Sequence, residues 1–118
     1  MQTHKDLDIW KLGMDLVEKI YFLTKNFPDD EKFGLTSQMR RASVSFPSNI
    51  SEGAARNSLK DYIRFLYISL GSLSELETQI LISKRLKFLN EKEILSDVEI
   101  LRKKTLNFIK YLKSKLDG

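Results

Sequence analysis

The sequence has no cysteine and only one histidine, His4, among its 118 residues. Without cysteine the chain forms no disulfide and offers neither a thiolate nucleophile nor a cysteine-ligated metal site. A single histidine cannot supply a di-iron centre that takes a Glu-x-x-His motif from each of two helices. A Ser-His-Asp triad would depend on a residue that precedes the first predicted helix. We therefore expect no metal, no cofactor and no catalytic residue.

Other absences argue against phosphate-binding loops and membrane spans. The chain contains neither a G-x-x-x-x-G-K-[ST] loop nor a G-x-G-x-x-G loop. No apolar run approaches the roughly 20 residues that span a bilayer, and residues 1–6 lack the apolar core of a signal peptide. Glu75 and Glu77 are close in sequence, but a helix turns their side chains about 200° apart. These features predict a cytoplasmic protein that is neither an enzyme nor bound to a membrane.

Five glycines and two prolines are few enough to allow long helices, since both residue types weaken a helix interior. The chain is 42% hydrophobic and 31% charged, which suits one soluble domain over residues 1–118. Apolar residues recur with a helical period over approximately 6–26, 30–55, 59–86 and 91–116. Short turns between these segments predict an all-α fold, an antiparallel up-down-up-down four-helix bundle. The alternative is a three-helix core with the first helix exchanged with a neighbouring chain.

Each predicted helix has an apolar stripe that faces the core. The stripes are Trp10, Met14, Val17 and Tyr21; Leu35, Met39, Ala42, Phe46, Asn49 and Gly53; Leu59, Tyr62, Leu66, Leu70, Leu73, Leu76 and Ile80; and Ile94, Val98, Leu101, Thr105, Phe108 and Leu112. A second apolar strip on the third helix contains Ile63, Tyr67 and Leu81. This strip either contacts another helix of the same bundle or forms an oligomer interface.

Residues 35–56 combine a helical period with many serines and a proline, which weaken an isolated helix. Close packing of another helix, or a bound partner, must compensate for this low helix propensity. Pro47 lacks an amide hydrogen, so we predict a kink there, or a break that restarts near Ser48. The segments 58–61 and 90–93 resemble capping boxes that begin the third and fourth helices.

Two acidic residues predict structural ion pairs. Glu77 falls on the apolar face of the third helix, and a buried carboxylate must find a cation or become protonated. Arg40, Arg41 and Arg56 on the second helix are its candidate partners. Glu52 and Arg56 are four residues apart, with the acid first, which favours an ion pair along the helix.

The formal net charge of +4 is unevenly distributed. Residues 1–31 hold four lysines against seven acids, whereas residues 32–64 hold six basic residues against two acids. The positive middle either attracts phosphate or is a solvated mixed surface. No sequence-specific module such as an RRM is present, so nucleic-acid contacts would be made mainly to phosphates. The candidate nucleic-acid-binding residues are Arg40, Arg41, Arg56, Lys60, Arg64, Lys84 and Arg85.

Two segments resemble the signature of a bacterial four-helix bundle family. They are residues 33–53, F-G-L-T-S-Q-M-R-R-A-S-V-S-F-P-S-N-I-S-E-G, and residues 65–77, F-L-Y-I-S-L-G-S-L-S-E-L-E. The family is named for open reading frames in intervening sequences of 23S ribosomal RNA genes, and some members carry a ribosomal-protein label. One departure is Ser51, where the family has alanine. The resemblance implies a four-helix bundle that assembles into a pentameric ring.

The same resemblance implies kinship with the basic, pentameric accessory protein of diversity-generating retroelements, which contacts nucleic acid and a reverse transcriptase. Two functional hypotheses follow. The first is a non-enzymatic homo-oligomer that binds RNA or another nucleic acid through a basic surface. The alternative is a protein–protein scaffold or accessory subunit that docks a partner enzyme. Binding driven by phosphate contacts weakens steeply as salt rises, which distinguishes the first hypothesis from the second.

Overall fold

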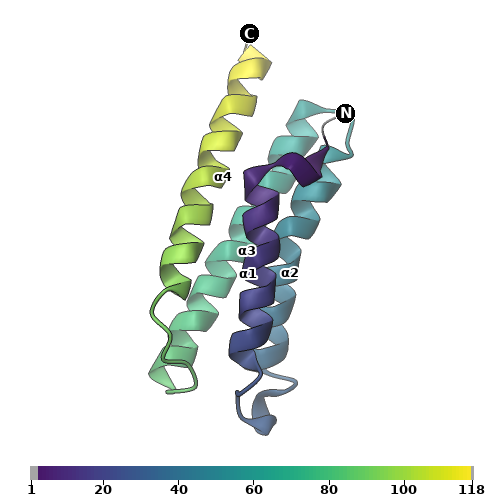
Figure 1. The fold of residues 1–118 in the computed structure, drawn as a ribbon. Helices are drawn as coiled ribbons and strands as arrows, with labels where there is room; N and C mark the ends of the chain where they lie inside the picture. Colours follow the sequence, from purple (N-terminus) through teal and green to yellow (C-terminus); the bar gives the residue numbers. More distant parts are fainter. Residues whose placement is uncertain (1–2, 118) are drawn as a thin grey trace.

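The computed structural model describes residues 3–117, which form four long helices (Figure 1). The helices are α1 (Asp8–Thr24), α2 (Leu35–Ala54), α3 (Leu59–Arg85) and α4 (Ile94–Asp117), and the short 3-10 turns η1 (His4–Asp6) and η2 (Asp29–Glu31) precede α1 and α2. The described part of the chain contains no strand, and the all-α prediction is confirmed. Residues 1, 2 and 118 of the predicted domain lie outside the described residues.

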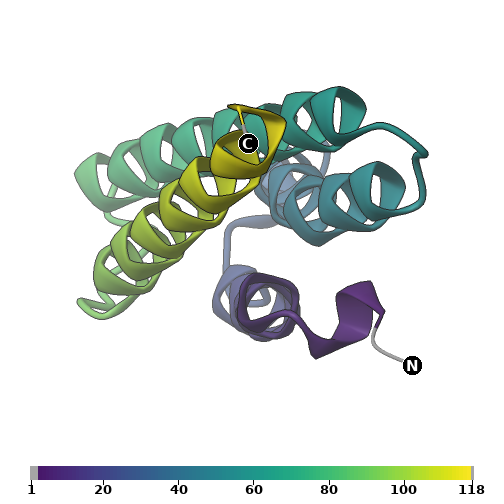
Figure 2. The same ribbon diagram turned by 90° about the horizontal axis from the view of Figure 1, so that it is seen from above.

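The helices form an elongated bundle with dimensions of 50 × 21 × 21 Å. Figure 1 shows that α1 and α3 run in one direction along the long axis, and α2 and α4 run in the other. Each helix packs against the next one in sequence, and α1 also contacts α4 of the same chain. Seen from above, α4 crosses α3 at an angle (Figure 2). The α2–α3 contact is the most extensive of the four, and the α1–α4 contact is the least extensive.

The core confirms three of the four predicted stripes. Phe46, Leu66 and Ile94 are fully buried, and they come from the stripes predicted for α2, α3 and α4. The stripe predicted for α1 is wrong, because Met14 and Tyr21 are each 42% exposed. The buried residues of α1 are Ile9, Gly13, Leu16, Ile20 and Thr24. α1 has apolar residues on two neighbouring faces, and the period alone does not identify the face that meets the other helices.

The serine-rich part of α2 forms a tight seam with α3. The hydroxyls of Ser45 and Ser72 share a hydrogen bond of 2.8 Å, and the hydroxyl of Ser69 donates to the carbonyl of Phe46 at 2.8 Å. Small side chains let the two helices approach closely, and their hydroxyls find partners inside the seam. Packing against α3 therefore compensates for the weak helix formers in α2.

Pro47 lies inside α2, which continues without interruption from Leu35 to Ala54. The predicted break near Ser48 is therefore wrong, because the helix does not restart there. The predicted kink stays a prediction. Side chains supply bonds to carbonyls around the proline: the amide of Asn49 donates to the carbonyl of Ser45 at 2.9 Å.

Two of the predicted helix starts are shifted. α2 begins later than predicted, at Leu35, because η2 is a separate turn, and the carboxylate of Glu31 accepts the amide of Leu35 at 3.0 Å. α3 begins as predicted after Ser58, whose hydroxyl accepts a backbone amide at 3.2 Å. The capping box predicted at Asn90 is wrong, because α4 begins at Ile94. The chain uses residues 90–93 to cross from α3 to α4.

Two glycines test the α2–α3 seam. A Cβ on Gly53 would lie 2.8 Å from the Cβ of Phe65, whereas a Cβ on Gly71 would have no neighbour within 4 Å. We expect Gly53→Ala to lower the free energy of unfolding by about 1–3 kcal/mol, because the two helices must move apart. Gly71→Ala should raise it by about 0.5–1 kcal/mol, because alanine favours the helix. Urea denaturation measures both, and equal effects of the two variants would contradict the seam.

Candidate nucleic-acid interface

The seven predicted cations lie at three separate places along the bundle and do not form one surface. These places are the α2–α3 turn (Arg56, Lys60 and Arg64), the first half of α2 (Arg40 and Arg41) and the far end of α3 (Lys84 and Arg85). The antiparallel helices separate them, because α3 carries the chain from one end of the bundle to the other (Figure 1). Each group therefore has its own surroundings.

At the α2–α3 turn, two guanidinium groups share one aromatic ring. The Cζ atom of Arg56 lies 5.0 Å from the ring centroid of Phe65, and that of Arg64 lies 4.6 Å from it. The two arginine side chains are 45% and 60% exposed. Lys60 is exposed between them in sequence. A cation–π contact orients a guanidinium group while it leaves N–H donors for a ligand.

The last turns of α4 add lysines at the same end of the bundle. The ammonium of Lys113 donates to the hydroxyl of Tyr67 at 2.8 Å, and Tyr67 lies one turn after Arg64 on α3. Lys115 lies 4.9 Å from the ring of Tyr111. The sequence between residues 103 and 116 contains five lysines and no acid. We define the basic end as Arg56, Lys60, Arg64, Lys113 and Lys115.

Arg40 and Arg41 hold helices together. The Nε atom of Arg40 donates to the hydroxyl of Thr24 at 2.9 Å, and its guanidinium lies 4.5 Å from the ring of Tyr21. Arg41 pairs with Glu75 at 3.1 Å. Arg40 thus joins α2 to α1, and Arg41 joins α2 to α3. Neither belongs to the basic end.

The far end of α3 is also separate from the basic end. Lys84 donates to the backbone carbonyl of Glu91 and ties α3 to the connection with α4, whereas Arg85 is exposed. The predicted set omitted Lys113 and Lys115, since their charge alone did not show where they lie. The antiparallel pairing of α3 with α4 is the signal that finds them, because it places the last turns of α4 beside the first turns of α3.

One predicted ion pair is confirmed, and the partner predicted for the other is wrong. Glu52 and Arg56 pair at 3.1 Å along α2. Glu77 pairs with Arg102 of α4 at 3.0 Å, and not with an arginine of α2. Its side chain is 37% exposed, so it is not a buried charge. The side of α3 that carries Glu77 is turned toward α4, and the helical projection of α3 alone could not tell which helix lies there.

The second apolar strip predicted on α3 divides into a buried and an exposed part. Ile63 is only 7% exposed and packs within the core of its own chain, so it cannot contact another subunit. Tyr67 and Leu81 are 45% and 46% exposed. Of the three predicted interface residues, these two have side chains that are accessible to a partner.

An apolar groove that the sequence did not predict follows the outer side of α1 and α2. Trp10, Met14 and Val17 line a hollow of about 360 Å³ together with Val44 and Pro47. The first three belong to the stripe that we had predicted to face the core. Trp10 also packs against the core, whereas Met14 is exposed, so this apolar stripe is only partly covered in the single chain.

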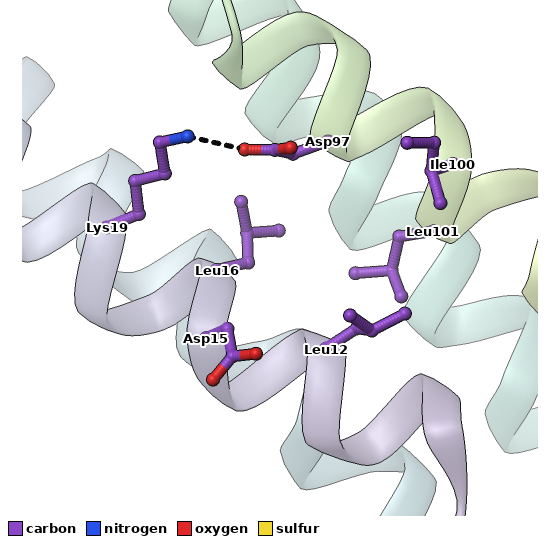
Figure 3. A pocket seen from close by; sticks show the side chains of 7 residues that line it. All are labelled: Leu12, Asp15, Leu16, Lys19, Asp97, Ile100 and Leu101. Atoms are coloured by element: carbon purple, nitrogen blue, oxygen red, sulfur yellow. Dashed lines mark hydrogen bonds and ion pairs between the residues drawn. The ribbon is translucent and has the colours of Figure 1, made fainter.

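A second hollow lies between α1 and α4, where the bundle is least tightly packed. Figure 3 shows Leu12 and Leu16 of α1 across from Leu101 of α4, with Lys19 and Asp97 at one end. Lys19 and Asp97 pair at 2.7 Å, and the hollow has a volume of about 290 Å³. The lysine also lies 3.7 and 4.0 Å from carboxylates in the α3–α4 connection. This ionic clamp joins α1 to the start of α4.

Residues 3–117 contain neither a metal-binding cluster nor a membrane-spanning helix. No group of three or more histidine, aspartate or glutamate side chains there could hold a metal ion. No helix in that range is long and apolar enough to cross a bilayer. The basic end, the apolar outer faces and the α1–α4 hollow are thus the features available to a partner.

Comparison with known proteins assigns the chain to a family. The sequence profile described as "23S rRNA-intervening sequence protein" matches residues 5–113. The chain belongs to this family. The predicted resemblance is therefore confirmed, and the 23S rRNA-intervening sequence proteins are described without an enzymatic activity. A comparison with curated proteins finds no match.

A solved structure supports the fold of this family member. It is the crystal structure of a protein of unknown function from the S23 ribosomal protein family of Bacteroides thetaiotaomicron. The two structures superpose with a TM-score of 0.78 at 21% sequence identity, over 86% of this chain and 95% of the other. The similarity extends over nearly the whole bundle, and at this identity it concerns the fold alone.

The ionic clamp predicts alkaline sensitivity. The hydrogen bond from Lys19 to Asp97 raises the pKa of Lys19 above 10.5, and burial raises the pKa of Tyr62 above 10.0. Both groups hold their protons more tightly in the folded state, so their stabilisation is present below these ordinary values and is lost as pH rises through the raised ones. We expect the free energy of unfolding, measured with urea, to fall above about pH 10.

Two variants separate these contributions. Lys19→Arg keeps its charge at alkaline pH, so it should remove the part of the stability loss that comes from Lys19. Tyr62→Phe has no ionisable hydroxyl, so it should remove the part that comes from Tyr62. A double variant that loses stability above about pH 10 as steeply as the wild type would contradict both assignments.

Proposed function

We propose that this protein is a non-enzymatic oligomer that binds structured RNA, or another nucleic acid, through the basic end. The observation that carries the proposal is the pair of exposed guanidinium groups on Phe65, beside lysines from the last turns of α4. Clustered cations with neighbouring aromatic rings are the features expected of a surface that follows a phosphate backbone.

Phosphate oxygens are the expected ligands of the basic end. A guanidinium binds phosphate through two parallel N–H donors, and an ammonium acts as a point charge. Glu52 and Asp61 pair with Arg56 and Arg64 at 3.1 and 3.7 Å. Exposed pairs of this kind contribute only about 0–1 kcal/mol, so a polyanion can displace the carboxylates. Binding of this type is strongly salt-dependent and only weakly specific for sequence.

The family description associates the protein with 23S rRNA genes and names neither a ligand nor a reaction. The structural neighbour is assigned to a ribosomal protein family. Neither description names a reaction. We place the protein in the cytoplasm, where RNA is available and where a cysteine-free chain needs no oxidising compartment.

We also propose that the chain forms a homo-oligomer through two different apolar faces. One is the outer groove of α1 and α2, which includes Trp10, Met14 and Val44, and the other is the exposed strip of Tyr67 and Leu81 on α3. Contact between unlike faces is heterologous, and such contacts close into a ring when the rotation permits. The pentamer implied by the family resemblance would be such a ring.

The second candidate function is a protein–protein scaffold that docks a partner enzyme. It is favoured by the apolar outer faces, which suit a protein partner as well as another copy of the chain. In that function the basic end would contribute little to binding, and salt would have a small effect.

Removing charge from the basic end tests the first function. We expect Lys60→Ala combined with Arg64→Ala to weaken binding to a 23S rRNA fragment roughly tenfold and to lower the slope of log K against log salt by roughly 2. The control is Arg85→Ala combined with Lys92→Ala, which removes the same charge from the other end. Fluorescence anisotropy over a salt series measures both. Equal losses in the two pairs, or no binding by the wild type at low salt, would refute the proposal.

Charged substitutions test the oligomer. Light scattering should give the wild type a mass several times that of one chain at micromolar concentration. Met14→Glu and Leu81→Glu should each reduce the mass to that of the monomer, because each places a charge in one of the two unlike faces. Both side chains are more than 40% exposed in the single chain, so the fold should persist. A monomeric wild type would show that these faces serve another purpose.

A further inference from the structure

The seam between α1 and α4 contains two hollows in a row. The first is the one in Figure 3, lined by Leu12, Asp15 and Ile100 among others, with a volume of about 290 Å³. The second lies nearer the basic end, is lined by Asp8 and Lys104 among others, and also has a volume of about 290 Å³. Together they form a discontinuous groove along the loosest contact of the bundle.

The spacing of the two hollows fits the repeat of an α-helix. Asp8 and Asp15 are seven residues apart on α1, and Asp97 and Lys104 are seven residues apart on α4. Seven residues of helix rise about 10.5 Å. A helix laid along the groove would therefore place side chains at i and i+7 into successive hollows. A compact small molecule would fill one hollow and leave the other empty.

The groove has a partly apolar floor. Lys19 of the α1 wall and Asp97 of the α4 wall pair with each other, and the remaining charges of the two walls are opposite in sign. The first hollow has Leu16 and Leu101 in its lining, and the second has Ile9 and Phe108. On the α1 wall, Asp8 and Asp15 are exposed, and the described residues provide no ion-pair partner for either. On the α4 wall, Lys104 is likewise exposed and unpaired within residues 3–117.

We propose that this groove docks one amphipathic helix of a partner protein. The apolar stripe of that helix has residues at i, i+3 or i+4, and i+7, which enter the two hollows. One flank carries lysine or arginine opposite Asp8 and Asp15, and the other flank carries glutamate or aspartate opposite Lys104. A second copy of this chain is not the proposed occupant of this groove. The faces proposed for contact between copies are the outer groove of α1 and α2 and the exposed strip of Tyr67 and Leu81 on α3.

Two synthetic helical peptides test the proposal. Both carry leucine at i, i+3 and i+7; the first has lysine on one flank and glutamate on the other, and the second has glutamate on both flanks. Calorimetric titration should show that the wild-type protein binds the first peptide roughly tenfold more tightly than the second. Asp8→Lys combined with Asp15→Lys makes both walls basic and should reverse this preference.

A matched pair of variants localises the binding. Ile100 and Leu106 lie on the same helix and are 47% and 45% exposed, but only Ile100 lines the groove. Ile100→Glu should therefore weaken binding of both peptides at least tenfold, whereas Leu106→Glu should leave it unchanged. Because both side chains are exposed, neither variant should unfold the protein, and circular dichroism checks this.

Three outcomes overturn the proposal. The first is that neither peptide binds the wild type at about 1 mM. The second is that Ile100→Glu and Leu106→Glu weaken binding equally, which would place the peptide elsewhere. The third is that Ile100→Glu lowers the mass of the oligomer in light scattering, which would make the groove an interface between copies. None of these measurements depends on RNA binding, so the groove and the basic end can fail independently.

Discussion

The close approach of α2 and α3 is the constraint on which the rest of the structure depends. α2 is poor in strong helix formers, and it is helical because α3 packs along it and because their serine hydroxyls bond across the seam. The tight seam leaves only residues 55–58 to connect the two helices. This short turn places Arg56 near Arg64, so that both reach the ring of Phe65. The basic end is therefore a consequence of the packing that makes α2 stable.

The two outer helices are attached to this pair in different ways. α1 meets α2 at Gly13, where a Cβ would lie 2.7 Å from the ring of Phe46, and α4 buries a regular apolar stripe against the bundle. Between α1 and α4 the main polar link is Lys19 with its carboxylate partners. A partly exposed ionic contact stabilises less than a packed apolar seam. The α2–α3 contact is therefore tightly packed and the α1–α4 contact is loosely packed. The two hollows lie along the α1–α4 contact.

Much of the fold could be predicted from the sequence because the stripes predicted for three helices contain residues that the structure buries. The stripe from Ile94 to Leu112 has only one way to face a core, and the structure buries it. α1 could not be predicted in this way, because Trp10 and Met14 form a stripe beside that of Ile9 and Leu16. Which of the two apolar stripes is buried depends on where the neighbouring helices lie, and the sequence of α1 alone does not contain that information.

The candidate site shows the same division between local and non-local information. The ion pair of Glu52 with Arg56 is set by spacing along one helix, and it was predicted correctly. The pair of Glu77 with Arg102 depends on which helix lies beside α3, and the predicted partner was wrong. The cations of the basic end come from segments about 50 residues apart, so charge counts along the chain could not bring them together.

Charge is distributed unequally between the two ends of the rod. The last turns of α4 and the α2–α3 turn lie at one end, where Lys113 and Lys115 join the three cations of that turn. The opposite end carries acidic residues in η2 and before α4, close to lysines that offset them. The cations of the basic end thus lie at one end of the 50 Å rod, away from most of its long sides. A ligand held at that end would cover little of the long sides of the rod, so occupation of the end and contacts along the sides need not exclude each other.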